Sequence, residues 1–225
     1  MSGILDRSRP LLCFVHDARD GTAPEGLWRV PAEAWSLVDL VQVRGKQVPA
    51  GELEDLTRAW IARLTTVPTR VVVNDRLDVA LAAGADGVHL GQDDLPLDVA
   101  RSLAPPGFLL GASTHDRGEL LAAQEAGADY AGLGAFFGSG TKVEAQRLDP
   151  SASGVVSAVP GLAIPVLAIG GVAADKVAEA VRVPAVTGIA VSAAIQVAGD
   201  PEAAIRRLRR ALERAWETAL EAVVG

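Results

Sequence analysis

Short apolar runs recur along the chain, and each is followed by a stretch whose apolar residues have helical spacing. The runs are rich in Val, Ile and Leu with few polar interruptions, which indicates strands buried on both faces of a sheet. Two of the helical stretches end in AGAD, a glycine signal for a helix terminus before the next strand. We expect eight strands, at Leu11–Asp17, Leu37–Arg44, Arg70–Asp75, Gly87–Gly91, Phe108–Ser113, Tyr130–Ala135, Pro165–Gly171 and Val186–Ala193.

Strict alternation of strands and helices favours parallel pairing with right-handed crossovers. Eight such units in 225 residues predict an α/β fold, a closed (β/α)8 TIM barrel forming a single domain over residues 1–225, with the core barrel at about 10–195. The alternative architecture is an open, doubly wound sheet. The helical candidates between strands include Glu52–Leu64, Arg76–Ala83, Arg117–Ala126 and Ala174–Val181.

A last helix is predicted at about 201–223, where apolar residues recur on one stripe. The stripe consists of Ile205, Leu208, Leu212, Trp216, Leu220 and Val223. A cluster of arginines lies between these positions, and we expect it on the solvated outer face. The cluster consists of Arg206, Arg207, Arg209 and Arg210.

Composition and charge narrow the classes of function. Hydrophobic residues make up 49% of the chain and aromatic residues 4%, as expected for β-branched strands under helices of small residues. A net charge of −7 disfavours binding to nucleic acid or anionic membranes. The single cysteine, Cys13, excludes an internal disulfide and is interpreted as a buried core thiol.

The sequence says less about where the protein is located and whether it forms oligomers. The chain shows no run long enough to span a bilayer, and its first ten residues lack the apolar core of a signal peptide. We therefore expect a cytoplasmic protein. The sequence leaves a homo-oligomer open beside a monomer.

Polar residues gather where the predicted strands end, which is where TIM barrels carry their chemistry. Asp75 and Asp94 follow neighbouring strands, so we expect their carboxylates to lie close together. Two such groups repel unless a proton or a cation lies between them. With Arg44, Lys46 and Lys142 expected on the same rim, the interpretation we favour is Mg²⁺ that also coordinates an anionic substrate.

The alternative for this acidic pair is a structural role, in which Asp75 and Asp94 each cap the helix that follows. Asp93, beside Asp94, is a weaker candidate for this site, and a simply exposed position is the alternative for it.

Three further segments suggest phosphate binding. Gly138–Lys142 (GSGTK) offers backbone N–H groups, two hydroxyls and an ammonium group, although it lacks the spacing of a Walker A loop. Ile169–Gly171 and Ala190–Ala193 end the last two strands, the usual phosphate position in this fold. Tight helix packing is the alternative role for these glycines. Among the three histidines, His115 is the candidate for proton transfer, and a structural role is the alternative.

The order and spacing of these segments resemble the thiamine phosphate synthases, in a superfamily that also contains thiazole tautomerases. The resemblance extends from about Val38 to Ile195. It rests on the segments VQVRGK, VNDRLDVALAAGADGVHLGQDDLP, GASTH, GADYAGLGAFFGSGTK, PVLAIGG and GIAVSAAI.

The resemblance implies an activity. A pyrimidine diphosphate, 4-amino-5-hydroxymethyl-2-methylpyrimidine diphosphate, would be coupled with hydroxyethylthiazole phosphate or its carboxylated form. Thiamine phosphate and pyrophosphate would be the products. In the family's dissociative reaction, the bond to pyrophosphate breaks early and the thiazole nitrogen captures the resulting cation, so no protein nucleophile is needed.

The resemblance also implies roles for individual residues. The pyrimidine diphosphate would be bound by Gln42, Val43, Arg44, Gly45, Lys46, Asn74, Ser113 and Lys142, of which Arg44, Lys46, Ser113 and Lys142 are the expected catalytic residues. The thiazole phosphate would be bound by Ser139, Gly140, Thr141, Gly171, Val191 and Ser192. Asp75 and Asp94 would hold Mg²⁺.

One segment departs from the family pattern. Synthases commonly carry a stretch resembling GPxFPTxTK, whereas Gly134–Lys142 reads GAFFGSGTK, without either proline and with Ser139 in place of the usual threonine. The hydroxyls and Lys142 are retained, so phosphate binding is still expected, but affinity or the choice of thiazole can differ. The first strand also ends in VHD instead of the more usual Thr-Asp.

Two other functions compete with the synthase. One is a thiazole tautomerase that uses His115 as its proton carrier, which would not need the metal-binding carboxylates. The other is a barrel without catalytic activity that binds a phosphorylated metabolite and regulates a partner. Retention of Gln42, Asp75, Asp94 and Lys142 favours the synthase.

Overall fold

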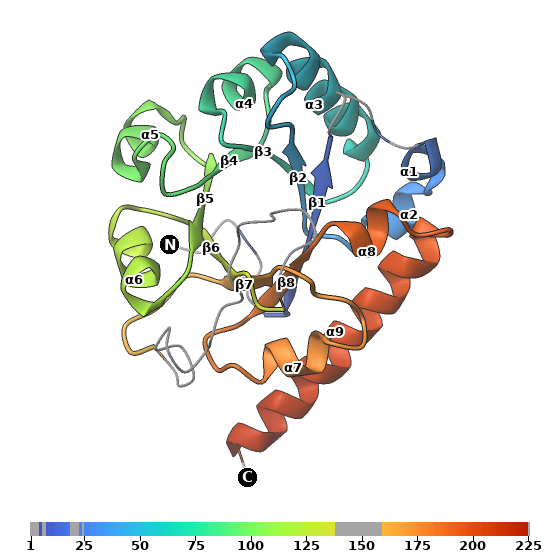
Figure 1. Cartoon of the computed structure of the whole chain (residues 1–225), viewed down its shortest axis with the longest axis vertical. Coiled ribbons are helices and arrows are strands. Elements are labelled where there is room, and N and C mark those ends of the chain that lie inside the picture. The colour runs from blue at the N-terminus through green and yellow to red at the C-terminus, as the bar shows by residue number, and fades with distance from the viewer. Residues whose placement is uncertain (1–4, 6–7, 19–22, 24, 138–158, 225) are drawn as a thin grey trace.

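Eight parallel strands form a closed barrel in chain order, with the helices outside the ring (Figure 1). The computed structural model describes residue 5, residues 8–18, residue 23, residues 25–137 and residues 159–224. Because β1 pairs with β8 through Leu11 and Gly188, the barrel is confirmed over the open sheet. The strands are β1 (Leu11–Asp17), β2 (Leu40–Arg44), β3 (Arg70–Asn74), β4 (Gly87–Leu90), β5 (Leu109–Thr114), β6 (Tyr130–Gly134), β7 (Val166–Ile169) and β8 (Gly188–Val191).

The described ranges contain nine helices, and the five for which the sequence analysis gave bounds agree with those bounds to within three residues at each end. They are α1 (Glu25–Arg29), α2 (Ala32–Trp35), α3 (Ala50–Leu64), α4 (Leu77–Ala83), α5 (Leu97–Leu103), α6 (Arg117–Glu125), α7 (Val177–Val181), α8 (Ala193–Gln196) and α9 (Pro201–Val224). Residues 138–158, between β6 and β7, lie outside the described residues. Within the described ranges, no helix combines the length and apolarity needed to cross a membrane.

The start of β2 differs from the prediction for an identifiable reason. We expected this strand from Leu37, but it begins at Leu40. The backbone N–H groups of Leu37 and Val38 still donate to carbonyls of α2, at 3.2 and 2.8 Å. Apolar side chains therefore continue the run at the sequence level, although the backbone is still turning out of the helix.

Side chains of each strand alternate between the barrel interior and the surrounding helices. Residues of matching parity from different strands form one interior cluster that includes Cys13, Val72 and Tyr130. The other face, with Phe14, Val41 and Val73 among its residues, packs against the helices in the largest apolar cluster. Cys13 is fully buried, which raises the pKa of its thiol, so its predicted role as a core residue is confirmed.

The same type of side-chain hydrogen bond recurs at the N-terminal ends of the odd-numbered strands β1, β3, β5 and β7. In each of four strand pairs, the residue just before the even strand accepts a hydrogen bond from a backbone N–H of the odd strand at 2.7–2.8 Å. The same residue returns its own backbone N–H to the carbonyl of that donor at 2.7–2.8 Å. The pairs are Leu12 with Asp39, Val71 with Asp86, Leu110 with Asp129, and Val166 with Thr187.

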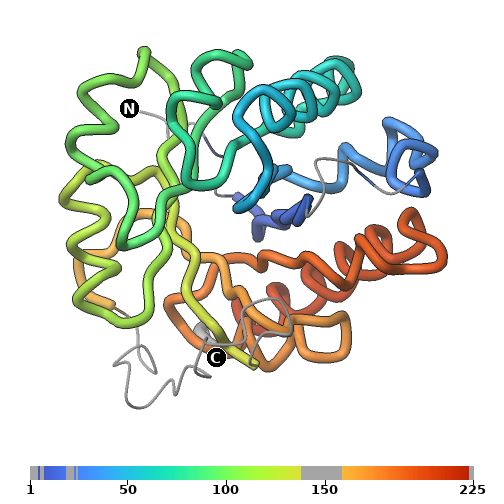
Figure 2. The backbone as a smooth tube through the Cα atoms, turned by 45° about the horizontal axis from the view of Figure 1, so that its top comes forward, coloured from blue at the N-terminus to red at the C-terminus, as the bar shows by residue number. Residues whose placement is uncertain are grey.

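Helix α9 joins the last and first parts of the barrel, since it contacts α7, α8 and α2. Figure 2 shows α9, in red, on the same side of the ring as the blue α1 and α2. The predicted stripe is buried at Ile205, Leu208 and Leu212, whereas Leu220 near the end of the helix is 52% exposed.

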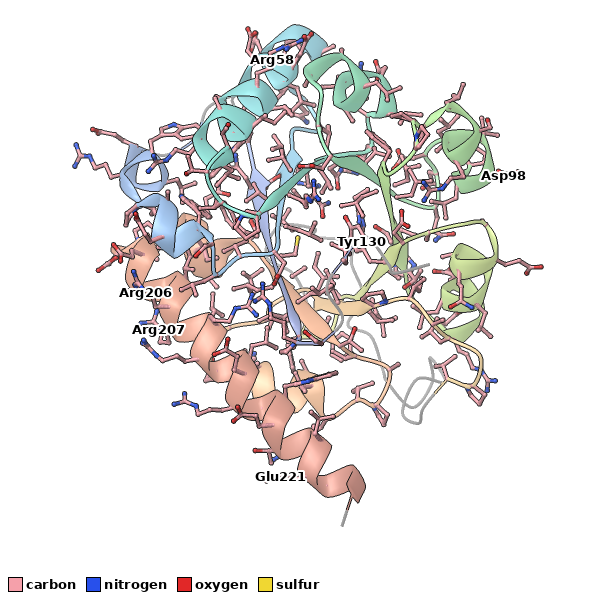
Figure 3. The ribbon with its side chains drawn as sticks, turned by 180° about the vertical axis from the view of Figure 1, so that it is seen from behind. Arg58, Asp98, Tyr130, Arg206, Arg207 and Glu221 are labelled. Atoms are coloured by element: carbon pink, nitrogen blue, oxygen red, sulfur yellow. The ribbon has the colours of Figure 1, made fainter. Side chains whose placement is uncertain are left out.

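Arg209 contradicts the prediction of a solvated arginine cluster. Arg206 and Arg207 do point away from the body of the protein (Figure 3), but Arg209 is only 2% exposed. Its guanidinium donates to the carbonyls of Leu37 and Pro10 at 2.8 Å and to the Asp39 carboxylate at 2.6 Å. The helix therefore buries one cation against the carboxylate that also accepts the Leu12 N–H.

We predict that Arg209→Met lowers the free energy of unfolding by about 3 kcal/mol, because it leaves two carbonyls and a largely buried carboxylate with fewer donors. Arg210→Met, on the same helix but exposed, is the matched control and should change it by less than about 0.5 kcal/mol. Urea unfolding of both variants measures the difference. Equal effects would show that the Arg209 contacts contribute no net stability.

Candidate active site

The strand alternation brings polar residues together at the C-terminal mouth of the barrel, including several that were predicted for the site and others that were not. Asp17 of β1 pairs in register with Arg44 of β2, and Asn74 of β3 pairs with His89 of β4. Ser113 of β5 pairs with Gly132 of β6. These positions lie an even number of residues from members of the interior cluster, on the same strand or on the paired strand. Their side chains therefore point into the barrel above that cluster.

Asp75 and Asp94 are brought together as predicted. The two carboxyl groups are within hydrogen-bonding reach of each other, and burial, followed by the charge and hydrogen bond of Asp94, raises the pKa of Asp75 to about 6. The backbone of Asp75 has a left-handed φ of 65°, and its N–H donates to the His89 carbonyl at 2.8 Å. Asp94 is held by the Gly91 N–H, at 2.6 Å from its carboxylate.

Neither aspartate caps the following helix. The N-cap residue of α4 is Arg76 and that of α5 is Pro96, and neither has a side-chain capping bond. The alternative in which the two aspartates cap the following helices is therefore wrong. Asp93 is exposed, which agrees with the alternative given for it.

The donor set of this pair suits Mg²⁺. Across the described ranges, no group of three or more His, Cys, Asp or Glu residues is arranged to hold a metal ion. Two carboxylates leave most positions of an octahedral ion to water and substrate oxygens, which is the usual arrangement for Mg²⁺. The positive charges of Arg44 and Lys46 lie close enough to oppose the rise in the pKa of Asp75, as a shared anion site would require.

Arg44 is held by a residue that the sequence analysis did not assign to the site. Its guanidinium forms an ion pair with Asp17, and the two side chains are only 13% and 10% exposed. The amide side chain of Gln196 in α8 bonds both the N–H and the carbonyl of Asp17, each at 2.9 Å. Lys46, one turn beyond the strand, is exposed.

Three further predicted residues lie on the inner face of the barrel. The Gln42 amide donates to Asn74 Oδ1 at 2.6 Å, and both side chains are buried. Ser113 Oγ lies 3.0 Å from His89 Nε2, while His89 Nδ1 lies 3.2 Å from the Tyr130 hydroxyl. His89 and Tyr130 were also not assigned to the site. A sequence signal existed for His89 alone, which lies between two glycines in the run GVHLG, but that run does not show which face of β4 is inward.

The remaining predicted residues are placed as follows. Gly171 follows β7 with a φ of 66°, and Ser192 is half-buried just before α8. The side chains of Val43 and Val191 are buried among the outer helices, so only their backbones face a ligand at the mouth. Gly45 is half-buried between β2 and α3. Ser139, Gly140, Thr141 and Lys142 lie outside the described residues.

His115 lies on the surface beside the mouth of the barrel. Its side chain is 57% exposed, and its Nδ1 lies 2.9 Å from the Glu119 carboxylate. A separate cavity of about 370 Å³ is lined by Ala173, Ala174, Asp175, Ala194, Arg207 and Leu208, none of which was predicted for the site.

Comparison with known proteins agrees with this geometry. The profile described as thiamine monophosphate synthase matches residues 12–195. The thiamine-phosphate synthase of Chlorobium luteolum is 40% identical over 200 residues, which cover 88% of this chain and 91% of that protein. The thiamine-phosphate synthase of Anaeromyxobacter dehalogenans is 45% identical over 174 residues, which cover 77% of each chain.

Solved structures give the same answer. The thiamine phosphate pyrophosphorylase from Pyrococcus furiosus superposes with a TM-score of 0.78 at 33% identity, covering 93% of this chain and 98% of that one. A 3-hexulose-6-phosphate synthase superposes with a TM-score of 0.67 at 18% identity, which shows a shared fold only.

The acidic pair predicts a pH dependence of stability in metal-free buffer. Because the pKa of Asp75 rises from 3.8 to about 6 on folding, the folded state binds the proton more tightly. Its contribution to stability is present below about pH 4 and is lost as the pH rises through 6. Asn accepts the left-handed backbone of Asp75 and does not titrate.

We therefore expect the melting temperature of Asp75→Asn, relative to that of the wild type, to rise across this pH range. Asp93→Asn, the exposed neighbour, serves as the control and should follow the wild type. A constant difference for Asp75→Asn would contradict the raised pKa. Differential scanning fluorimetry with a chelator at each pH provides the measurement.

Proposed function

The chain belongs to the thiamine monophosphate synthase family, and from this premise we propose the reaction and the roles of its residues. The family's enzymes are transferases of thiamine biosynthesis. The substrates proposed are 4-amino-5-hydroxymethyl-2-methylpyrimidine diphosphate and hydroxyethylthiazole phosphate or its carboxylated form. The products are thiamine phosphate and pyrophosphate, and the carboxylated form would also release CO2. The observation that carries the proposal is the acidic pair of Asp75 and Asp94 beside the cations of Arg44 and Lys46.

The proposed chemistry is a dissociative substitution. The bond between the pyrimidine methylene carbon and the diphosphate oxygen breaks, and its electron pair leaves with pyrophosphate. The lone pair of the thiazole nitrogen then forms the new C–N bond to the methylene cation. No side chain needs to act as a nucleophile, so the protein contributes position and charge.

The cations at the mouth would stabilise the leaving group. Arg44 and Lys46 would lie close to the negative charge that develops on the diphosphate, with Lys142 proposed as a third cation from outside the described residues. Asp75 and Asp94 would hold Mg²⁺, which when bound neutralises charge on the diphosphate oxygens. Gln42, Asn74 and Ser113 would orient the pyrimidine.

The thiazole phosphate would bind at the ends of β7 and β8. Gly171 has no side chain to block an approach to its backbone N–H, and Ser192 contributes a hydroxyl. Ser139, Gly140 and Thr141 are proposed to complete this site, together with the backbone of Val191. The cytoplasmic location and the oligomeric state stay predictions.

The test is to incubate the protein with the two substrates and Mg²⁺ and to measure the thiamine phosphate formed by chromatography. Asp94→Asn should lower kcat/KM by about a hundredfold or more, because one charged group that organises the leaving diphosphate is lost. Asp93→Asn removes the same charge from an exposed neighbouring position and should retain activity. A folded wild type without product would overturn the proposal for these substrates.

Asp17 provides a second test, because its ion pair and the Gln196 contacts orient Arg44. Asp17→Asn retains the size of the side chain but removes the charge that holds the guanidinium. We expect kcat/KM to fall by about tenfold, in the range typical of groups that orient a ligand-binding residue. Steady-state kinetics with varied pyrimidine diphosphate measures this change. Unaltered kinetics would show that Arg44 needs no such support.

A further inference from the structure

A buried chain of hydrogen bonds ends at Ser113. The Tyr130 hydroxyl lies 3.2 Å from His89 Nδ1, and His89 Nε2 lies 3.0 Å from Ser113 Oγ. Tyr130 is 1% exposed and His89 is 5% exposed, whereas Ser113 is half-buried at the mouth. The chain therefore runs from the closed interior of the barrel to its open end, through residues of three adjacent strands.

Two glycines leave the space that this chain occupies. A side chain at Gly111 would collide with the phenol ring of Tyr130, and its Cβ would lie 2.5 Å from His89 Nδ1. A Cβ at Gly132 would lie 3.4 Å from the imidazole. Tyr130 belongs to the interior cluster and lies among the strands of the barrel (Figure 3). The His89 ring is therefore confined by packing from two neighbouring strands as well as by its hydrogen bonds.

One direction of these hydrogen bonds is permitted by every donor and acceptor in the chain and leaves a donor at the mouth. Burial raises the pKa of the Tyr130 hydroxyl, so it keeps its proton and can donate to His89 Nδ1. A neutral imidazole that accepts at Nδ1 carries its proton on Nε2 and donates from there. In this arrangement Ser113 Oγ accepts from His89, and its own hydrogen is left for an acceptor at the mouth of the barrel.

We propose that His89 is a positioning residue that fixes the Ser113 hydroxyl as a hydrogen-bond donor to the pyrimidine diphosphate. The proposal rests on the proposed function, in which Ser113 contacts that substrate. The backbone of Ser113 is held independently by β5 and by the Gln92 side chain, which donates to its carbonyl. His89 therefore determines the orientation of the hydroxyl without being needed to place the strand.

Two substitutions of His89 separate positioning from packing. Asn ends near the Nδ1 position and can still contact Tyr130, whereas the longer Gln places an amide near Nε2, within reach of Ser113. His89→Asn should lower kcat/KM for the pyrimidine diphosphate by about tenfold, which corresponds to one lost hydrogen bond. His89→Gln should recover most of that loss, and the KM for the thiazole phosphate should stay unchanged in both.

A double-mutant cycle with Ser113→Ala provides the decisive comparison. If His89 acts through Ser113, His89→Asn causes no further loss once the hydroxyl is absent. A loss of the same size in both backgrounds would overturn the proposal, as would a Gln variant no better than Asn. Melting temperatures of all variants identify any that fail to fold.

A spectroscopic measurement tests the hydrogen bonds without relying on activity. In ¹⁵N-labelled protein, His89 should carry its proton on Nε2, and Ser113→Ala should shift that resonance while the His16 and His115 signals stay in place. The His89→Gln variant assigns the signal. A proton on Nδ1, or no response to Ser113→Ala, would overturn the positioning role. Absence of product in the wild type would instead count against the proposed function, so the two failures are distinguishable.

Discussion

Closure of a parallel barrel requires each strand to exchange hydrogen bonds along both edges, and in this chain side chains complete that exchange at the N-terminal ends. Asp39, Asp86, Asp129 and Thr187 each accept a backbone N–H from the preceding odd strand. Three of the acceptors are carboxylates that also form an ion pair with an arginine. Register at this end determines which residue of every strand reaches the interior at the other end.

The site depends on that register more than on any local motif. A strand shifted by one residue would exchange its inward and outward faces. Val43 would then replace Arg44 at the mouth, and the ion pair with Asp17 could not form. Contacts at the N-terminal ends of the strands thus fix the register on which the side chains at the opposite end depend.

The two ends use buried charge differently. Arg209 is surrounded by two carbonyls and a carboxylate, so its charge is satisfied within the protein. At the mouth, Asp75 and Asp94 face each other without a direct ion-pair partner among the described residues, and the pKa of Asp75 rises accordingly. Such unbalanced charge is unfavourable in the free protein, and it is consistent with the proposed binding of a cation and a diphosphate.

The sequence by itself determined the strand and helix pattern, the barrel and the acidic pair, because apolar periodicity and order along the chain are local properties. It did not determine the roles of Asp17, His89 or Arg209. When both faces of a strand are apolar, composition does not distinguish inward from outward residues, so the direction of His89 became evident only with register. Arg209 contacts residues 170–199 positions away, and its burial was decided only when α9 packed against the first strands.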